Sequence, residues 1–284
     1  MMQREDENEP ELSLFHILVS EGDIDLFKYF ARKVGYKHMF GTKKSRWGTK
    51  KEYTPLHEAA SRGNFDICKF IIDQVEDKNP ANETGHTPFH IAAKHDSNNS
   101  HFDICQLIFE ATGFHNPSDK YGETPLHSAA FNGNLKICEM IIEKVDHKNP
   151  ASNRWNENDT PLHRAAKEGH FEICKLIIEK VVVKNPSNDR GVTPLHCAAE
   201  NNDLEICKLI IENIGENNPS DNLGNTPLHH AAKNSNLEMC KLICQNIADK
   251  NPRNYIGRTP LDWAYEEKDL RILYFLIGEN NLQY

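Results

Sequence analysis

The stretch TPLHCAAENNDLEICKLIIEN, Thr193–Asn213, decides the fold because it holds a complete helical hairpin. Thr193 is suited to cap a helix and Pro194 to occupy its first position, where the missing N–H would have no partner anyway. The pair Ala198–Ala199 leaves one helix face thin enough for a neighbouring helix to approach closely. After a polar break, Leu204–Asn213 carries Leu, Ile and Cys at helical spacing, which predicts a second, amphipathic helix.

The same pattern recurs along the chain at intervals of 33 to 37 residues. Its opening words, of the type TPLHxAA with a degenerate TPLDWAY at the end, begin at Thr54, Thr87, Thr124, Thr160, Thr193, Thr226 and Thr259. Upstream, Ser13–Phe30 follows the same template with His16 in the histidine position. Because one such unit cannot bury its apolar face alone, we expect consecutive units to stack.

The segments between the hairpins predict turns. An Asn-Pro pair such as Asn218–Pro219 follows each second helix, and we expect it to end that helix because proline disfavours a helical residue before it. The next stretch, for example SDNLGN before Thr226, is typical of a tight turn with Gly224 at positive φ.

These motifs resemble the ankyrin repeat, whose 33-residue period and T-P-L-H-x-A word are matched from Ser13 onward. The resemblance implies an all-α fold: an ankyrin-repeat solenoid of stacked helical hairpins with projecting β-hairpin-like fingers. It also implies that finger tips and first helices line a concave, partner-binding face. The chain departs from the common pattern because its second helices lead into K-N-P-like words rather than Gly-Ala-Asp.

The repeats divide the chain into five expected segments. At both ends larger residues replace the Ala-Ala pair, Leu18–Val19 in the first unit and Ala264–Tyr265 in the last, so both end units are interpreted as caps rather than as cut edges of a longer array. The segments are an acidic flexible tail (1–10), an N-terminal capping repeat (11–34), a basic, aromatic-containing insertion or finger (35–53), six ankyrin repeats (54–258) and a C-terminal capping repeat (259–284).

Composition narrows the function classes. Lys and Arg number 33 against 42 Asp and Glu, a net charge of -9, which disfavours nucleic acid as a partner. The sequence has no apolar run near the roughly 20 residues that span a bilayer, and its acidic start is unlike a secretory signal. We therefore expect a monomer in the cytoplasm, with the nucleus as a second compartment, and no membrane insertion.

Cysteine and histidine recur at fixed repeat positions, which indicates that these residues have structural rather than catalytic roles. Six of the eight cysteines occupy the same repeat position, after Ile or Met in a second helix, where we expect buried, unpaired thiols in a reducing compartment. The TPLH histidine is expected to hydrogen-bond into the turn that it follows. No catalytic or nucleotide-binding motif occurs in a suitable context. We therefore predict no enzymatic activity, no catalytic residue, no metal site and no cofactor.

Positions that vary between repeats predict the partner-binding surface. The sequence favours a non-catalytic scaffold or adaptor that binds a protein or peptide, with Tyr121, Phe131 and Trp155 as aromatic anchors. Trp155 has two interpretations, a partner contact or packing against a neighbouring finger. The full set of expected contact residues is Tyr53, Arg62, His86, Lys94, Tyr121, Phe131, Trp155, Glu168 and Arg190.

A basic segment offers an alternative function. Residues 32–51 contain eight Lys or Arg side chains and no acidic one, with aromatics interleaved. Such a stretch suits a phosphate-bearing ligand, meaning nucleic acid, a nucleotide or a lipid headgroup, or an acidic protein, and a solvated loop remains the plain interpretation. The candidate contacts are Lys43, Lys44, Arg46, Trp47, Lys50 and Lys51.

The resemblance further implies a modification. The asparagine of each Asn-Pro pair matches the finger asparagine that an oxygenase β-hydroxylates in some ankyrin-repeat proteins, although the proline after it departs from the family pattern. The candidates are Asn79, Asn116, Asn149, Asn185, Asn218 and Asn251.

Overall fold

The described part of the chain folds into helices and turns. The computed structural model describes residues 14–35, 53–95, 99–113, 115–153, 157–215 and 218–281. These residues contain no extended strand, although an isolated antiparallel bridge joins Ser152 to Asp159. The prediction of an all-α repeat fold is confirmed.

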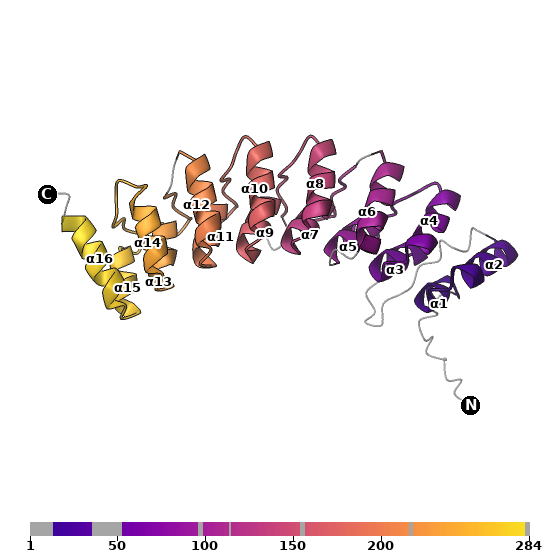
Figure 1. Ribbon diagram of the computed structural model, residues 1–284, viewed down its shortest axis with the longest axis horizontal. Coiled ribbons are helices and arrows are strands. Elements are labelled where there is room, and N and C mark those ends of the chain that lie inside the picture. The colour runs from indigo at the N-terminus through magenta and orange to yellow at the C-terminus, as the bar shows by residue number, and fades with distance from the viewer. Residues whose placement is uncertain are drawn as a thin grey trace, which may run out of the picture. The chain divides into compact units, whose positions relative to one another are not determined.

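The chain divides into two compact units, of which the first comprises residues 1–129 and 136–145. In it α3 packs between α1 and α5, while α4 packs between α2 and α6, so first helices form one row and second helices another (Figure 1). Its helices are α1 (Leu14–Glu21), α2 (Ile24–Val34), α3 (Pro55–Arg62), α4 (Phe65–Gln74), α5 (Pro88–Lys94), α6 (Asn99–Ala111) and most of α7 (Pro125–Phe131) and α8 (Leu135–Lys144).

The second unit comprises residues 130–135 and 146–284. Its first helices α9, α11, α13 and α15 pack in series, and α10, α12, α14 and α16 form the matching second row (Figure 1). The bounds are α9 (Pro161–Glu168), α10 (Phe171–Lys180), α11 (Pro194–Glu200), α12 (Leu204–Asn213), α13 (Pro227–Lys233), α14 (Leu237–Cys244), α15 (Pro260–Glu266) and α16 (Leu270–Asn281).

The core lies between the two rows of helices. The alanines of the TPLHxAA words have no solvent exposure, as their predicted role in close helix packing requires. The second helices contribute Ile and Cys, and α12 buries Ile206, Cys207, Ile210 and Ile211. All eight cysteines are buried and free, in agreement with the prediction that they act as small apolar side chains.

The histidine in the first turn of a first helix makes two kinds of hydrogen bond. In α11, Nδ1 of His196 accepts from the backbone N–H of Thr193 at 3.1 Å, while its Nε2 lies 3.1 Å from the carbonyl oxygen of Asn225 in the next repeat. A backbone N–H can only donate and a carbonyl can only accept. His196 must therefore carry its proton on Nε2.

We call the bond from Nε2 to the next repeat the histidine tether. The prediction of a bond into the histidine's own turn captured half of this arrangement and missed the tether. The other tethers in the two units are His16 to Tyr53 O (2.8 Å), His57 to His86 O (3.1 Å), His90 to Glu123 O (2.9 Å), His163 to Val192 O (3.0 Å) and His229 to Arg258 O (3.2 Å).

The last repeat keeps the helix cap without the tether. Asp262 replaces the histidine, and its Oδ2 accepts from the backbone N–H of Thr259 at 2.8 Å and from the Thr259 hydroxyl at 2.9 Å. A carboxylate has no second nitrogen with which to reach a further carbonyl. The substitution suits a terminal unit.

The expectation that Asn-Pro ends the second helix is wrong. Helix α4 ends at Gln74, because Val75 takes an extended conformation (φ -106°, ψ 151°), and Asn79 follows in the connecting segment. There the asparagine serves the next helix instead: its Oδ1 accepts the backbone N–H of Phe89, the second residue of α5, at 3.1 Å. The equivalent bonds run from Leu126 to Asn116 (3.3 Å), Leu162 to Asn149 (3.0 Å), Leu195 to Asn185 (3.0 Å), Leu228 to Asn218 (3.4 Å) and Leu261 to Asn251 (3.3 Å).

The tethers predict a loss of stability in mild acid. Burial lowers the pKa of His57 and of His196 to about 4, and it also lowers the pKa of His163 and His229. The unfolded chain, whose histidines titrate near 6.5, therefore takes up protons first, so stability holds above pH 6.5 and falls as the pH approaches 4. The expected loss is up to about 3 kcal/mol for each of His57 and His196.

Urea unfolding midpoints measured between pH 7 and 4.5 check this, and the pH dependence should be shallower in His196→Gln, which cannot titrate at that position. A midpoint that stays constant down to pH 4.5 would contradict the assignment of neutral, buried tethers.

Burial of the cysteines predicts that their thiols react slowly until the chain unfolds. Burial raises the pKa of Cys197 and of Cys244 to about 12, and it raises the pKa of Cys68, Cys174, Cys207 and Cys240 further. Because the thiolate is the reactive form, a disulfide reagent at pH 8 should label the native chain slowly and all eight thiols after denaturation. A native disulfide seen by non-reducing mass spectrometry, or rapid labelling of any one thiol, would refute this.

Candidate functional site

Each regular finger between repeats is built around one buried Asn or Asp. In the last but one finger, Oδ1 of Asp221 accepts the backbone N–H groups of Leu223 and Asn225, both at 2.8 Å. Gly224 follows with φ 78°, and a Cβ there would lie 2.8 Å from the backbone nitrogen of Tyr255, so only glycine fits. Each such Asn or Asp stands three residues before a glycine, a spacing that is visible in the sequence although it did not enter the predictions. The residues in this role are Asn82, Asp119, Asn188, Asp221 and Asn254.

Neighbouring fingers are joined by backbone hydrogen bonds within each unit. In the second unit, Asn222 donates to Arg190 O at 2.8 Å and Tyr255 donates to Leu223 O at 3.0 Å. In the first unit, the backbone N–H of Lys120 donates to the carbonyl of Thr84 at 3.1 Å. The tips are therefore held in register, and their side chains are presented from a fixed backbone.

Three of the expected contact residues in the first unit are open to solvent. Tyr121, at a finger tip, is 50% exposed, and Lys94 is exposed at the end of α5. Arg62 is exposed and forms an ion pair with Glu58 one helical turn away, at 2.8 Å. These side chains are available to a partner.

The other two, Tyr53 and His86, are half-buried in contacts between repeats. The Tyr53 ring lies 5.0 Å from the His57 ring, and burial followed by the nearby Glu58 charge raises the pKa of Tyr53. His86 Nε2 lies 3.0 Å from a carboxylate oxygen of Asp119 on the next finger. Both residues therefore take part in contacts within the fold.

In the second unit, Phe131 is 42% exposed and Glu168 is exposed. Arg190 is exposed at a tip and forms an ion pair with Glu157 at 2.6 Å. Trp155 lies outside the described residues, and Tyr121 and Phe131 belong to different units, so the structure does not bring the three aromatic anchors together. The basic candidates between Lys43 and Lys51 likewise lie outside the described residues.

A patch whose residues are not among the expected anchors is more exposed than Tyr121 or Phe131. Leu223 is 67% exposed, Tyr255 is 76% exposed and Ile256 is 75% exposed, all on two consecutive finger tips. The backbone bond between Tyr255 and Leu223 joins the two finger tips that carry these three side chains. The signal was present, because both residues after the finger Asn in N-Y-I-G are large and apolar. We call these residues the apolar fingertip patch.

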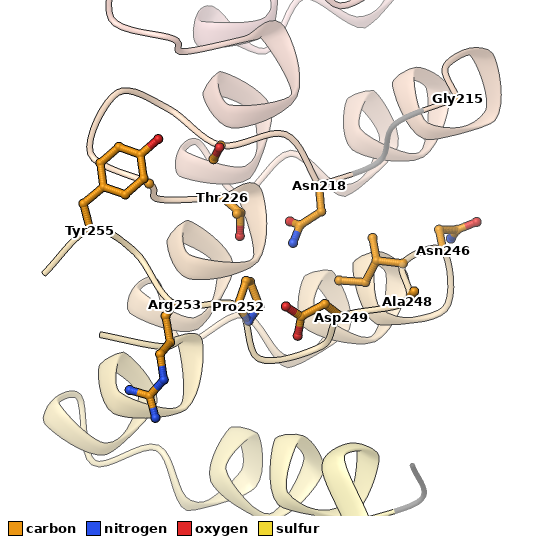
Figure 2. Close-up of a pocket in the computed structure, with 12 residues that line it drawn as sticks. Gly215, Asn218, Thr226, Asn246, Ala248, Asp249, Pro252, Arg253 and Tyr255 are labelled. Carbon is orange, nitrogen blue, oxygen red and sulfur yellow. The ribbon is translucent and has the colours of Figure 1, made fainter. Parts of the chain in front are cut away.

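A pocket of the second unit, lined in part by Tyr255, lies beside this patch and is a groove between loops. It has a volume of about 450 Å³, and Asn218, Pro252 and Asp249 lie around its middle (Figure 2). Asn218 accepts the backbone N–H of Leu228, and Asp249 accepts that of Asn251 at 3.0 Å. The polar groups of the pocket are thus used in holding the loops, and its lining residues include no His, Cys or Lys.

Three metal-ligating side chains meet in the first unit, although the sequence analysis named none of them as a ligand. His86, Asp119 and Glu123 each place one donor atom within 4.8 Å of the others. Asp119 and Glu123 are buried. The residues lie on two fingers, 33 and 37 positions apart, so no local spacing motif marks them.

The chain was compared with known families and proteins. A family model described as ankyrin repeats (3 copies) matches residues 15–116, 97–153, 145–221 and 213–284. No curated protein matches the chain. In the described part of the chain, no helix has the length and apolar character needed to cross a bilayer.

The finger geometry predicts unequal effects for two neighbouring substitutions. Asn188→Ala removes the acceptor of the Arg190 and Val192 N–H groups, at 2.9 and 3.0 Å, together with a 2.8 Å bond to Asp159. Because Asn188 is buried, the free energy of unfolding should fall by about 1–3 kcal/mol. Arg190→Ala removes only an exposed ion pair and should change it by less than about 1 kcal/mol. Equal urea unfolding midpoints for the two variants would contradict this description of the finger.

Proposed function

The chain belongs to the ankyrin-repeat family, whose repeats generally mediate protein–protein interaction, and we propose that this chain is a non-catalytic scaffold or adaptor. Its partner is a protein or peptide that binds the surface formed by finger tips and first helices, the concave face in the family's fold. The observation that carries the proposal is the apolar fingertip patch. Large apolar side chains gathered on a rigid surface are typical of interaction sites.

The polar groups of the fingers hold the turns, which leaves the apolar tip side chains available to a partner and supports the proposed binding surface. The side chain of Asp221 and the backbone of Leu223 are engaged in holding the turn and the next finger, whereas the Leu223 side chain makes no such contribution and is 67% exposed. Variable tip residues can therefore change without loss of the fold. Tyr121, Phe131 and Trp155 are proposed as further anchors, with Arg62, Lys94, Glu168 and Arg190 as charged contacts that orient the partner.

The non-catalytic character is supported by the chemistry of the recurring histidines and cysteines. A general base needs a ring nitrogen that is free to take a proton, yet burial lowers the pKa of His196 to about 4, and its Nδ1 already accepts the backbone N–H of Thr193. A nucleophile needs a thiolate, yet burial raises the pKa of Cys197 to about 12. The free thiols also suit a reducing compartment, and we propose the cytoplasm.

The basic segment supports a second candidate function. Residues 32–51 hold eight basic side chains and no acidic one, in a chain of net charge -9. Such a concentration suits a phosphate-bearing ligand, through Lys43, Lys44, Arg46, Trp47, Lys50 and Lys51. Titration with a phosphate-rich ligand at two salt concentrations separates the candidates, because binding through phosphates weakens steeply with salt and binding through apolar anchors does not.

The six finger asparagines are also proposed as sites of β-hydroxylation. The Oδ1 atom of each caps the helix that follows, so an added hydroxyl on Cβ would sit at the start of that helix. Intact-mass analysis of the chain from native cells should show species heavier by one oxygen, and their absence would remove this proposal.

The apolar fingertip patch predicts which substitutions abolish partner binding. Leu223→Ala, Tyr255→Ala and Ile256→Ala, and separately Tyr121→Ala, Phe131→Ala and Trp155→Ala, should each weaken binding by more than about tenfold, since truncation of a hot-spot side chain costs about 2 kcal/mol. Unfolding midpoints should shift little, because exposed positions contribute within about 0.5 kcal/mol.

The measurement is quantitative capture of the proteins that the wild-type chain enriches from native lysate. Lys175→Ala and Lys208→Ala, on the second helices, serve as matched controls and should bind normally. If the fingertip variants capture the same proteins as strongly as these controls, the assigned surface is wrong.

A further inference from the structure

The cluster His86, Asp119 and Glu123 spans two consecutive fingers of the first unit, the one between α4 and α5 and the one between α6 and α7. We propose that it binds a transition-metal ion, with Zn²⁺ preferred, and that the ion clamps these two fingers together. The site is distinct from the apolar fingertip patch, so it goes beyond the proposed interaction function.

The carboxylate of Asp119 is held in place by its own finger. Its Oδ1 accepts the backbone N–H groups of Tyr121 and Glu123, both at 2.8 Å, which turns Oδ2 toward His86. His86 Nε2 lies 3.0 Å from that oxygen. A ligating carboxylate whose second oxygen is fixed by hydrogen bonds is the usual arrangement around a bound metal.

The two fingers are fixed at the distance that a shared ion needs. The backbone N–H of Lys120 donates to Thr84 O at 3.1 Å. A Cβ on Gly85 (φ 85°) would lie 2.8 Å from Cα of Asp119, so the fingers touch where only glycine is tolerated. The donor atoms are therefore presented by backbones that cannot drift apart.

The charges of the cluster favour a divalent cation. Asp119 is 6% exposed and Glu123 is 8% exposed, and buried carboxylates are costly unless a positive charge accompanies them. His86 offers an imidazole nitrogen, and Asp119 and Glu123 each offer a carboxylate oxygen, which are donors that divalent transition metals accept. A divalent ion bound by the neutral imidazole balances both carboxylates.

Equivalent finger contacts in the second unit are made by an amide donor. In the second unit, the amide nitrogen of Asn188 donates to Asp159 Oδ1 at 2.8 Å, and that of Asn254 donates to Asn225 Oδ1 at 2.9 Å. At Asp119 a carboxylate stands where those fingers have an amide. Among the described residues, this is the cluster in which three His, Cys, Asp or Glu donors come together.

The donor set selects the metal. One imidazole nitrogen and two carboxylate oxygens suit Zn²⁺, which binds them at about 2.0–2.2 Å and holds its ligands roughly 3–3.5 Å apart. The 3.0 Å between His86 and Asp119 already matches, whereas the Glu123 oxygen, within 4.8 Å of the other two donors, would have to move closer to bind the same ion. Water fills the fourth position, on the side where the His86 side chain is 28% exposed. Mg²⁺ and Ca²⁺ prefer oxygen ligands alone and should not compete.

The test is metal binding by the full chain after removal of metals with a chelator. Isothermal titration with Zn²⁺ should show one site per chain, thermal unfolding should move to higher temperature, and Co²⁺ should give the visible spectrum of a four-coordinate site. Mg²⁺ at the same concentration should produce none of these changes.

Asp119→Asn is the sharpest variant, because Asn82, Asn188 and Asn254 show that the finger accepts asparagine there. It should weaken Zn²⁺ binding at least tenfold and leave the metal-free unfolding midpoint nearly unchanged, and Glu123→Gln should weaken binding to a similar degree. His95→Gln, which alters another histidine of the same unit, is the matched control and should bind normally. Absence of Zn²⁺ binding, or binding that persists unchanged in Asp119→Asn and Glu123→Gln, would overturn the proposal and assign any uptake to other histidines.

Discussion

The histidine tether is the interaction on which the rest of the structure depends. One imidazole fixes the start of its own helix through Nδ1 and holds the next repeat through Nε2, as His196 does with Thr193 and Asn225. Both bonds are buried, and a buried donor or acceptor left unpaired costs about 1–3 kcal/mol. A ring in the wrong tautomer or charge state therefore loosens a helix and a repeat interface together. This explains why the same residue returns in successive repeats, whereas Asp262 provides the helix cap alone.

The tether also determines where function can reside. The threonine, the histidine and the alanine pair of each repeat are committed to packing, and one side-chain oxygen of each finger Asx holds its turn, so a partner must be recognised by the residues that remain. Those residues lie at the finger tips, where the backbone is rigid and the side chain is free to vary. Leu223 and Ile256 present apolar area there, whereas His86 and Asp119, on other fingers, meet each other. One scaffold thus offers different surfaces at different repeats.

Much of this architecture follows from the sequence, because each repeat contains residues that determine the structure of their own segment. Thr193 and Pro194 mark the start of α11, and Leu204–Asn213 was predicted with the bounds that α12 has. The prediction was wrong where the side chain of a residue hydrogen-bonds to the following helix and not to its own segment. Asn79 was assigned to the end of one helix because proline follows it, yet its side chain caps the next helix through Phe89.

The candidate sites were harder to predict for the same reason. Exposure of Tyr121 was expected from its place beside a turn, but the meeting of His86 with Asp119 depends on which positions of two repeats face each other. The structure shows that the residue before a TPLH threonine can contact the finger Asx of the next repeat, as Asp159 contacts Asn188. With this rule the facing positions of two repeats can be assigned from the sequence. Sequence periodicity alone does not reveal this pairing.

The most direct test of the tether is the tautomer of each TPLH histidine in the folded chain. Long-range ¹H–¹⁵N NMR spectra of imidazole-labelled protein at pH 7 report which ring nitrogen carries the proton. The structure requires a protonated Nε2 and an unprotonated Nδ1 at His57, His90, His163, His196 and His229. Rings protonated at Nδ1, or rings that exchange between the two tautomers, would leave the threonine N–H groups without their acceptor and contradict the account.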